Sequence, residues 1–506
     1  MMHVEAPHKQ ETNSPHSIPV TNPLTGEIMG SVPIQTRDEV FTTVAKARAA
    51  QPAWAALPVK TRNQYLRRWC DLLLEHRDEV IAIIRRETGK SESSAFSEIP
   101  VIDLAVNYNA RLAERLLKPQ RRKPTIPFLH QAKVIYKPRG VIGFITPWNY
   151  PLNNAFIDLI AALIGGNTAI LKPSEITPFT SEYVLQLMAE AGVPKDVVIR
   201  VTGNGSTGEA IIDAVDYVSF TGSTATGRKV AVRCAERLIG CSLELGGKDA
   251  AIVLDDADVD VAVAGIIRGT YENSGQICVA LERTYVEKGI YPAFVQGVIE
   301  RVNQMRISAE AGLNVDMGSL TNQRELERTE AFIADAVSKG AKVVAGGQRR
   351  PDLGPLFFEP TVLVDVDHTM QVMNEETFGP IMPILKVDDA QEALRLANSS
   401  PYGLSGAIFT KNIAQGEALA SQMECGDVSI NRPQFAFATP TVPIGGVKNS
   451  GLGRRNGEEG FLRFLSPQSI MADRMWVKQT AITHADPLTL RIYFLLRKIR
   501  KVIPWV

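Results

Sequence analysis

Residues 141–173 read VIGFITPWNYPLNNAFIDLIAALIGGNTAILKP, and this stretch holds the pattern that decides the fold. A short apolar run, Val141–Ile145, precedes a helical stretch at Ala155–Ile164 and a second strand-like run at Thr168–Leu171. The alternation continues as far as a further run at Tyr217–Phe220. Alternating strands and helices are typical of an open parallel sheet with helices on both faces.

A second series of strands and helices begins after Gly246-Gly247. Asp249–Leu254 has the composition of a buried strand, and Val259–Ser274 predicts a long helix of small and apolar residues. Further strand-like runs follow, for example Thr361–Leu363. The sequence therefore predicts an α/β fold with two open parallel-sheet, Rossmann-like domains, and a site built from both would lie between them.

Composition argues against several classes of function. The 55 basic and 55 acidic residues cancel, so no overall field would attract nucleic acid, and we expect no nucleic-acid partner. Five cysteines without a close pair favour a reducing compartment over a disulfide framework. No histidine or cysteine spacing matches a metal site, so no metal is expected. The sequence shows no secretory signal and no run of eighteen apolar residues, which predicts a cytoplasmic protein.

The last residues, 488–506, differ from the rest of the chain. On a helix, leucine, isoleucine and valine side chains fall on one face and arginine and lysine on the other, and the segment ends near Trp505. This pattern predicts an amphipathic helix that either lies in the plane of a membrane surface or packs its apolar face on protein. Both alternatives stay open at this point.

Three segments carry residues suited to one reaction. Cys278 is the last residue of NSGQIC, where a glycine opens space near the sulfur. Glu244 lies in LELGGK between apolar neighbours, which should raise the pKa of its carboxyl group toward that of a useful base. Asn149 lies in TPWNYP, a loop stiffened by two prolines, where a rigid amide can stabilise an oxyanion. The simpler interpretations are a buried cysteine, a glutamate paired with Lys248, and an ordinary turn residue.

A glycine-rich motif also invites a cofactor interpretation. Gly203–Gly208 matches G-x-G-x-x-G, but it follows the third strand of its unit and lacks the expected acidic residue further on. We interpret it as a tight turn between strand and helix more readily than as the main phosphate site.

The chain resembles the aldehyde dehydrogenase superfamily from about Asn22 to about Ser469. The resemblance rests on seven segments in the family's order: TPWNYP (146–151), LKPSE (171–175), FTGSTATG (220–227), LELGGK (243–248), GQIC (275–278), EETFGP (375–380) and GGVKNSGLGR (445–454). It implies that Cys278 is the nucleophile, Glu244 the general base and Asn149 the oxyanion donor, with oxidation of an aldehyde to an acid through a thiohemiacetal and a thioester.

The same resemblance implies a nicotinamide cofactor. The expected contacts lie on the same segments: Trp148, Lys172, Ser174, Glu175, Phe220, Gly222, Ser223, Leu245, Gly246, Glu376 and Phe378. A carboxylate at Glu175 suits free ribose hydroxyls and would repel a 2′-phosphate, so NAD is favoured and NADP remains possible.

The resemblance also implies a domain plan and an assembly. The expected parts are an NAD-binding domain (20–117 and 138–246), a catalytic domain (247–446), a small β oligomerisation element (118–137 and 465–487) and the amphipathic tail (488–506). We expect a homodimer or a homotetramer.

The substrate is a small-molecule aldehyde, and its class is harder to predict. The tail favours a long-chain or lipophilic aldehyde, as in fatty aldehyde dehydrogenases, on an enzyme in peripheral contact with a membrane. GRRNGEEG (453–460) instead resembles some succinate-semialdehyde dehydrogenases, and Arg432 could meet a substrate carboxylate. A non-catalytic, membrane-associated binding protein is a third alternative, against which the presence of Cys278, Glu244 and Asn149 argues.

Overall fold

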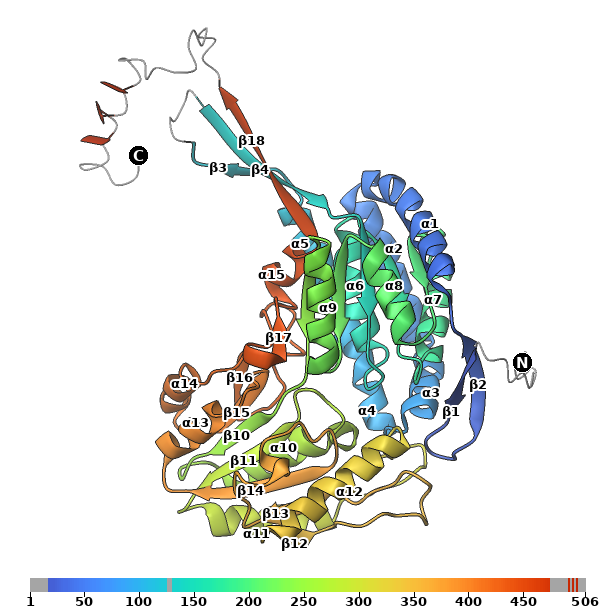
Figure 1. Cartoon of the computed structure of the whole chain (residues 1–506). Coiled ribbons are helices and arrows are strands. Elements are labelled where there is room, and N and C mark those ends of the chain that lie inside the picture. Colours follow the sequence, from blue (N-terminus) through green and yellow to red (C-terminus); the bar gives the residue numbers. More distant parts are fainter. Residues whose placement is uncertain (1–16, 125–129, 474–489, 492–493, 496, 499–506) are drawn as a thin grey trace. The chain divides into compact units, whose positions relative to one another are not determined.

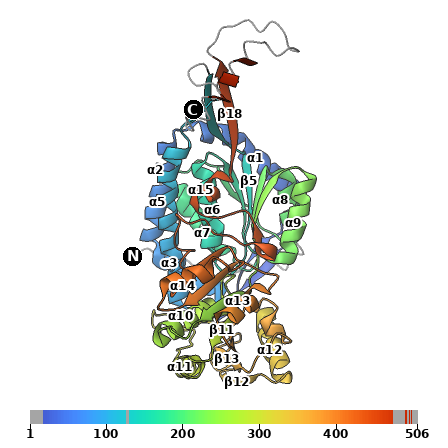
Figure 2. The ribbon, with the colours of Figure 1, turned by 90° about the vertical axis from the view of Figure 1, so that its left-hand side faces the viewer.

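The computed structural model describes residues 17–124 and 130–473, together with 490, 491, 494, 495, 497 and 498. Among these, residues 17–113 and 138–465 form one compact unit, and the described parts of 114–137 and 466–506 form another. Figure 1 labels the elements, and Figure 2 shows the ribbon from the side. Both large sheets belong to the first unit.

The first unit opens with a hairpin and a series of helices. The hairpin pairs β1 with β2 antiparallel, and α1 begins with a capping box in which Thr36 and Glu39 satisfy each other's backbone N–H groups. The elements are β1 (Ser17–Thr21), β2 (Ile28–Pro33), α1 (Arg37–Ala56), α2 (Val59–Glu75), α3 (Arg77–Thr88), α4 (Glu92–Phe96) and α5 (Glu98–Leu116).

The sheet expected around residues 141–221 is present and has six strands, in the order β17-β9-β8-β5-β6-β7. Five of its strands run parallel to their neighbours, and the short β17 pairs antiparallel with β9 at the edge. The strands are β5 (Val141–Ile145), β6 (Thr168–Lys172), β7 (Val198–Arg200), β8 (Tyr217–Thr221), β9 (Gly240–Glu244) and β17 (Gly451–Leu452).

Helices cover this sheet because its strands are apolar on both faces. One buried apolar cluster joins the sheet to α1, α8 (Gly205–Ala214) and α9 (Thr224–Glu236). α6 (Asn153–Ile164) contacts β5, β6 and α2, and all twelve of its residues are buried. α7 (Phe179–Glu190) packs against α2 and α3. The apolar run at 153–164 is therefore a core helix, which explains its length and composition.

The second sheet has seven strands, in the order β12-β13-β14-β11-β10-β15-β16, and only β12 runs antiparallel to its neighbour. Its strands are β10 (Asp249–Val253), β11 (Leu281–Glu287), β12 (Lys342–Ala345), β13 (Thr361–Val364), β14 (Ile381–Val387), β15 (Ser405–Phe409) and β16 (Asp427–Ile430). Its helices are α10 (Val259–Tyr271), α11 (Tyr291–Asn303), α12 (Gln323–Ser338), α13 (Ala390–Asn398) and α14 (Ile413–Ala420), and α15 (Gly457–Leu462) follows β17.

The helix predicted over Val259–Ser274 is three residues shorter in the structure. α10 ends at Tyr271, and a 3-10 turn over Glu272–Gly275 follows, in which Asn273 and Ser274 have φ of 52° and 57°. Positive φ is incompatible with a right-handed helix, and apolar periodicity does not reveal it. The difference matters because this turn leads to Cys278.

The second unit is a three-stranded sheet in the order β18-β4-β3. β3 (Gln120–Arg122) pairs antiparallel with β4 (His130–Pro138), and β18 (Leu465–Asp473) flanks β4 on its other side. The predicted tail, 488–506, lies mostly outside the described residues. The six that are described are helical and exposed. Among the described residues, no helix is long and apolar enough to cross a membrane.

Candidate active site

A cavity of about 880 Å³ lies at the carboxyl ends of β5, β6, β8 and β9. Ligands of open α/β sheets bind at this edge of the sheet. Residues of α12 and of the segments that hold Cys278, Glu376 and Phe378 complete the lining. Every catalytic and cofactor residue that the sequence predicted lines this cavity: Trp148, Asn149, Lys172, Ser174, Glu175, Phe220, Gly222, Ser223, Glu244, Leu245, Gly246, Cys278, Glu376 and Phe378.

Cys278 follows the left-handed turn at 273–275. Burial, together with the carboxylate of Glu244, raises the pKa of its thiol to about 12. The thiol is therefore protonated at neutral pH in this structure. A base must remove its proton for the sulfur to act as a nucleophile.

Buried hydrogen bonds hold the turn before Cys278 in its unusual conformation. The Ser274 hydroxyl donates to the Gly318 carbonyl at 3.1 Å, and the Gln276 N–H donates to the Asn273 carbonyl at 3.0 Å. Gly275 has φ of +75°, and a side chain there would collide with the backbone at Gly379. Residues in such conformations persist only where their surroundings enforce them.

Glu244 ends β9 and is 8% exposed. Its Oε1 has no hydrogen-bond partner among the described residues, and a Cβ on Gly445 would lie only 3.0 Å from it. Lys248, which could have neutralised it, pairs instead with Glu282 at 2.8 Å. Burial raises the pKa of Glu244 to about 7, so the group can take up and release a proton near neutral pH.

A buried cluster of charges surrounds this carboxyl group. Arg455 donates from Nε and Nη2 to the two oxygens of Asp158, both at 3.1 Å, and Arg463 pairs with the same carboxylate. Both arginines act to lower the pKa of Glu244, against the larger effect of burial. The cluster therefore limits how far burial raises the pKa of Glu244.

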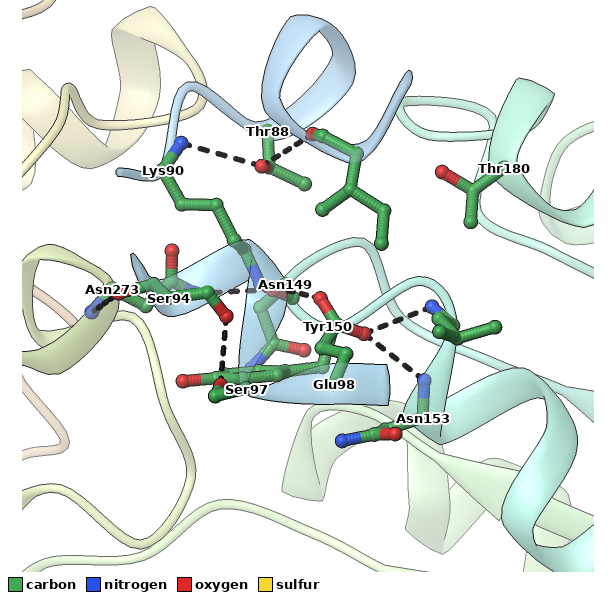
Figure 3. Close-up of polar contacts among 12 residues, drawn as sticks. Thr88, Lys90, Ser94, Ser97, Glu98, Asn149, Tyr150, Asn153, Thr180 and Asn273 are labelled. Carbon is green, nitrogen blue, oxygen red and sulfur yellow. Dashed lines mark hydrogen bonds and ion pairs between the residues drawn. The ribbon is translucent and has the colours of Figure 1, made fainter. Parts of the chain in front are cut away.

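Asn149 is 3% exposed, and both ends of its side-chain amide are engaged. Nδ2 donates to the Gln276 carbonyl at 2.8 Å, and Oδ1 accepts from Asn154 Nδ2 at 3.3 Å. Because an amide nitrogen carries two hydrogens, one remains available to a bound oxygen atom. Asn149 is thus held as a rigid donor next to the Cys278 segment, and Figure 3 shows the surroundings of its loop.

One end of the cavity carries groups that suit a ribose. Lys172 Nζ lies 3.4 Å from Glu175 Oε2, and the Glu175 side chain is 38% exposed. The Ser174 hydroxyl accepts the Ile176 N–H at 3.2 Å, which forms a tight turn after β6. Ammonium and carboxylate groups side by side offer both a donor and an acceptor to vicinal hydroxyls.

Glu376 and Phe378 also line the cavity. The Glu376 Oε1 accepts the Gly247 N–H at 3.1 Å, and burial raises the pKa of Glu376 to about 7. The Phe378 ring packs edge-on against Trp148, with ring centroids 5.4 Å apart. Both residues thus have fixed positions next to the glycines that join the two sheets.

The middle of the cavity can admit a dinucleotide. A Cβ on Gly246 would lie 2.4 Å from a Glu376 carboxylate oxygen, and one on Gly222 would lie 2.7 Å from the Phe220 ring. Ser223 caps α9, whose first N–H groups suit an anion such as a pyrophosphate. A dinucleotide therefore fits the donors and the spaces that these residues leave.

The glycine-rich motif plays a peripheral part. Gly203 has φ of +147°, and a side chain there would collide with Thr207, which is what a tight strand-to-helix turn requires. Gly205 and Gly208 do line the cavity.

Arg432, which the sequence suggested as a contact for a substrate carboxylate, does not line the cavity. Its guanidinium lies 4.8 Å from the Phe435 ring centroid.

Several residues that shape the site were not predicted from the sequence. They are the buried charges Lys90, Glu98, Asp158 and Arg455. Asp158 left one signal, since it is a lone acid in the apolar run 153–164. Arg455 lies in the segment 453–460, which the sequence singled out without indicating that this side chain is buried. Lys90 and Glu98 show nothing in the sequence that separates them from surface charges.

Comparisons with known proteins agree with this geometry. Residues 9–470 match the model of the aldehyde dehydrogenase family. A protein of Mycolicibacterium smegmatis, provisionally named succinate-semialdehyde dehydrogenase [NADP(+)], is 40% identical over 468 residues, which cover 92% of this chain and 90% of that protein. A Sinorhizobium fredii protein with the same provisional name is 37% identical, and the match covers 91% of this chain and 93% of that protein.

Solved structures give the same result. Betaine aldehyde dehydrogenase from Staphylococcus aureus in complex with NAD+ superposes with a TM-score of 0.87 at 33% identity, covering 95% of this chain and 96% of that one. An NADP-dependent enzyme of E. coli also gives 0.87, at 34% identity, with 92% and 97% covered. The chain therefore belongs to the aldehyde dehydrogenase family, and it is an NAD(P)-dependent aldehyde dehydrogenase.

Proposed function

We propose that the protein oxidises succinate semialdehyde to succinate through a covalent thioester on Cys278. The observation that carries the chemical part is the meeting of Cys278, Glu244 and Asn149 in one cavity with the cofactor residues. Three residues distant in sequence there supply a nucleophile, a base and an oxyanion donor. This is the set that acyl chemistry at a carbonyl needs.

The first step joins the sulfur to the aldehyde carbon. Glu244, with a pKa of about 7, accepts the proton of the Cys278 thiol as the S–C bond forms. The free hydrogen of the Asn149 amide and the backbone N–H of Cys278 stabilise the resulting oxyanion. When bound, NAD(P)+ supplies the acceptor for the hydride that the thiohemiacetal loses as it becomes a thioester.

Hydrolysis of the thioester completes the turnover. After passing its first proton to solvent, Glu244 takes a proton from a water molecule that attacks the thioester carbon. The C–S bond breaks, the acid leaves, and Glu244 returns its proton to the departing thiolate, which regenerates the thiol for the next aldehyde. A base at this position favours water over a second thiol such as coenzyme A as the attacking group.

The lining of the cavity supports the cofactor contacts that the family resemblance implies. Lys172 and Glu175 would hold the adenosine ribose, Ser223 and the start of α9 the pyrophosphate, and Glu376 with Phe378 the nicotinamide ribose and ring. Trp148, Ser174, Phe220, Gly222, Leu245 and Gly246 would complete the contacts.

Replacing the nucleophile tests the chemical part. Cys278→Ala should form no detectable NAD(P)H from any aldehyde, while cofactor binding measured by fluorescence titration stays within about twofold of the wild type, since the sulfur is not a cofactor contact. Cys425→Ala, which replaces a cysteine outside the cavity, is the matched control and should remain active. Turnover by Cys278→Ala would disprove the covalent route.

The substrate assignment rests on the names of the relatives at 37–40% identity. A substrate profile tests it: kcat/KM for succinate semialdehyde should exceed that for butanal, which has the same chain length without the carboxylate. An equal or higher value for butanal would refute this substrate.

A lipophilic aldehyde is the second candidate, and the tail favours it. Leu490, Phe494 and Leu495 are 44%, 53% and 59% exposed. Large apolar side chains exposed on a basic helix suit the surface of an anionic membrane. In this case kcat/KM should rise with chain length in the presence of vesicles containing phosphatidylglycerol, and deletion of 488–506 should remove the increase. Unchanged kinetics in the truncated protein would reject this candidate.

A further inference from the structure

We propose that Lys90 and Glu98, a buried ion pair outside the cavity, are positioning residues that fix the Asn149 carboxamide next to Cys278. The inference rests on the role of Asn149 proposed above. It adds two residues that neither contact the cavity nor belong to any segment of the family resemblance. Figure 3 shows both residues together with Asn149 and Tyr150.

The pair lies in the protein interior. Lys90 Nζ and Glu98 Oε1 are 2.8 Å apart, and neither side chain is accessible to solvent. Lys90 follows α3, after Gly89 ends that helix in the left-handed conformation, and Glu98 is the first residue of α5. A buried ion pair adds little stability compared with apolar side chains of the same volume. Its value lies in the directed bonds that it makes.

Those bonds are concentrated on one short segment, 149–153. Lys90 Nζ donates to the Asn149 carbonyl at 2.8 Å and lies 3.7 Å from the centroid of the Tyr150 ring. Glu98 Oε2 accepts the N–H groups of Leu152 and Asn153, both at 3.0 Å, at the start of α6. The ion pair therefore holds the segment at four of its five residues.

The opposite side of the segment is joined to the turn that carries the nucleophile. Asn273 Nδ2 donates to the Asn149 carbonyl at 3.0 Å and to the Gln276 carbonyl at 3.2 Å. The Gln276 carbonyl also accepts one hydrogen of the Asn149 amide. Lys90 and Asn273 thus share one acceptor, so the ion pair fixes the backbone of Asn149 relative to the Cys278 turn.

These contacts determine where the catalytic hydrogen points. With one amide hydrogen bonded to Gln276, the direction of the second follows from the planar geometry of the amide and the position of the backbone. An oxyanion donor acts only if it is already in place when the charge develops. Loss of the ion pair would let residues 149–153 shift and would misalign this hydrogen.

A purely structural role is the alternative, and the chain offers a matched control for it. Glu87 is also fully buried, and its carboxylate accepts the N–H groups of Phe179 and Thr180 at the start of α7. It therefore does for α7 what Glu98 does for α6, but it has no contact with the Asn149 segment. Glu87→Gln reports the effect of losing a buried helix cap alone.

The experiment is a double-mutant cycle between the ion pair and Asn149. The readout is the single-turnover rate of NAD(P)H formation at saturating cofactor, which precedes hydrolysis. The Lys90→Met/Glu98→Gln variant removes both charges while preserving size, and we expect its rate to fall roughly ten- to a hundredfold, because small misplacements at a reacting centre have effects of this order. Cofactor affinity should be unchanged, and Glu87→Gln should lower Tm without lowering the rate.

The Asn149→Ala background separates the outcomes. If the ion pair acts through Asn149, adding Lys90→Met/Glu98→Gln to Asn149→Ala should lower the rate further by less than about twofold. An equal loss in both backgrounds, or no loss in the wild-type background, would overturn the inference. A wild-type rate in Asn149→Ala alone would instead refute the proposed role of Asn149. If the double variant does not fold, Glu98→Gln alone replaces it, with the same criteria.

Discussion

Glu244 shows how the surroundings of one side chain set its chemistry. Its carboxyl group lies in the interior with an unpartnered oxygen, and burial outweighs the two arginines nearby, so that its pKa is about 7. A glutamate on the surface would be fully ionised at this pH and too weak a base to help a thiol or a water molecule. Burial at the end of β9 therefore makes Glu244 a stronger base, suited to proton transfer near neutral pH.

This raised pKa predicts the pH dependence of hydrolysis. The base must be ionised, so the deacylation rate should rise with pH with a midpoint near 7 and level off above it. Glu244→Gln lacks the base for both steps, so we expect at most a small burst of NAD(P)H and a slow steady-state rate without a midpoint near pH 7. Rapid-mixing absorbance at 340 nm measures both phases. A full steady-state rate in this variant would contradict the assignment.

The same shift has a consequence for stability. Because the pKa is raised above the ordinary value of 4.5, the folded state binds more protons than the unfolded chain between pH 4.5 and about 7. Stability from this group is present below pH 4.5 and is lost as the pH rises through about 7. Glu244→Gln should therefore raise Tm at pH 8 relative to the wild type, and this gain should vanish at pH 4.5.

A second prediction at the residue scale concerns the cofactor. Glu175 presents a partly exposed carboxylate beside Lys172, and this would repel the 2′-phosphate of NADP+. We expect a higher kcat/KM with NAD+, and Glu175→Gln should shift the ratio toward NADP+ by about tenfold. The relatives named for NADP(+) make this a discriminating measurement. A wild-type preference for NADP+ would refute it.

The sequence alone predicted the residues that line the cavity but not the buried charged residues that contact them. Cys278, Glu244 and Asn149 lie in short motifs with recognisable glycines and prolines. Lys90 does not, because its importance comes from burial beside a partner 59 positions away in the chain. Arg455 lies in the segment 453–460, but nothing in that segment indicates its buried pairing with Asp158, 297 positions away. Long-range contacts of this kind leave no local pattern.

Among the elements, the turn over Glu272–Gly275 has the largest effect on the site. We predicted a helix as far as Ser274 because the stretch 259–274 is rich in small and apolar residues, but α10 ends at Tyr271. In the structure two consecutive positive-φ residues redirect the chain toward the cavity. Their conformation is set by hydrogen bonds to α4, to the Asn149 loop and to residues 318–319, none of which a helical pattern can indicate.

The segment 376–378 depends on another buried pair. Lys248 Nζ bonds Glu282 at 2.8 Å, and the Glu282 carboxylate accepts the N–H groups of Thr377 and Phe378 at 2.7 and 2.9 Å. Lys248→Met/Glu282→Gln should therefore weaken NAD(P)+ binding by about tenfold, as second-layer contacts do elsewhere. Fluorescence titration measures this, with Lys288→Met, in an exposed pair with Asp388, as the control. Unchanged affinity would show that the segment needs no such support.

Over the whole molecule, the two sheets were predictable because each strand and helix repeats a local pattern. The antiparallel edge strand β17 was not. β17 comes from residues 451–452, more than two hundred positions after β9, and is only two residues long. Such a strand carries no periodicity of its own. The proposed division into domains at 246–247 remains a prediction, since both sheets lie in one compact unit.

The small sheet of β3, β4 and β18 predicts assembly. β18 is at one edge of it, and an edge strand offers unpaired N–H and carbonyl groups to a second chain. We expect a homodimer or a homotetramer by light scattering. Met471, 61% exposed on β18, should contribute, so Met471→Glu should shift the mass toward smaller species, whereas Gln468→Glu on the same strand should not. A monomeric wild type would refute the expectation.

The protonated state of Cys278 also bears on durability. Peroxides and alkylating agents attack thiolates, so a sulfur with a pKa of about 12 should resist both while the enzyme is idle. Inactivation by iodoacetamide should be slow at pH 7 and accelerate steadily up to pH 10, as mass spectrometry of the residue 278 peptide would reveal. An enzyme that binds reactive carbonyl compounds is thereby protected from oxidation or alkylation of its Cys278 sulfur between turnovers.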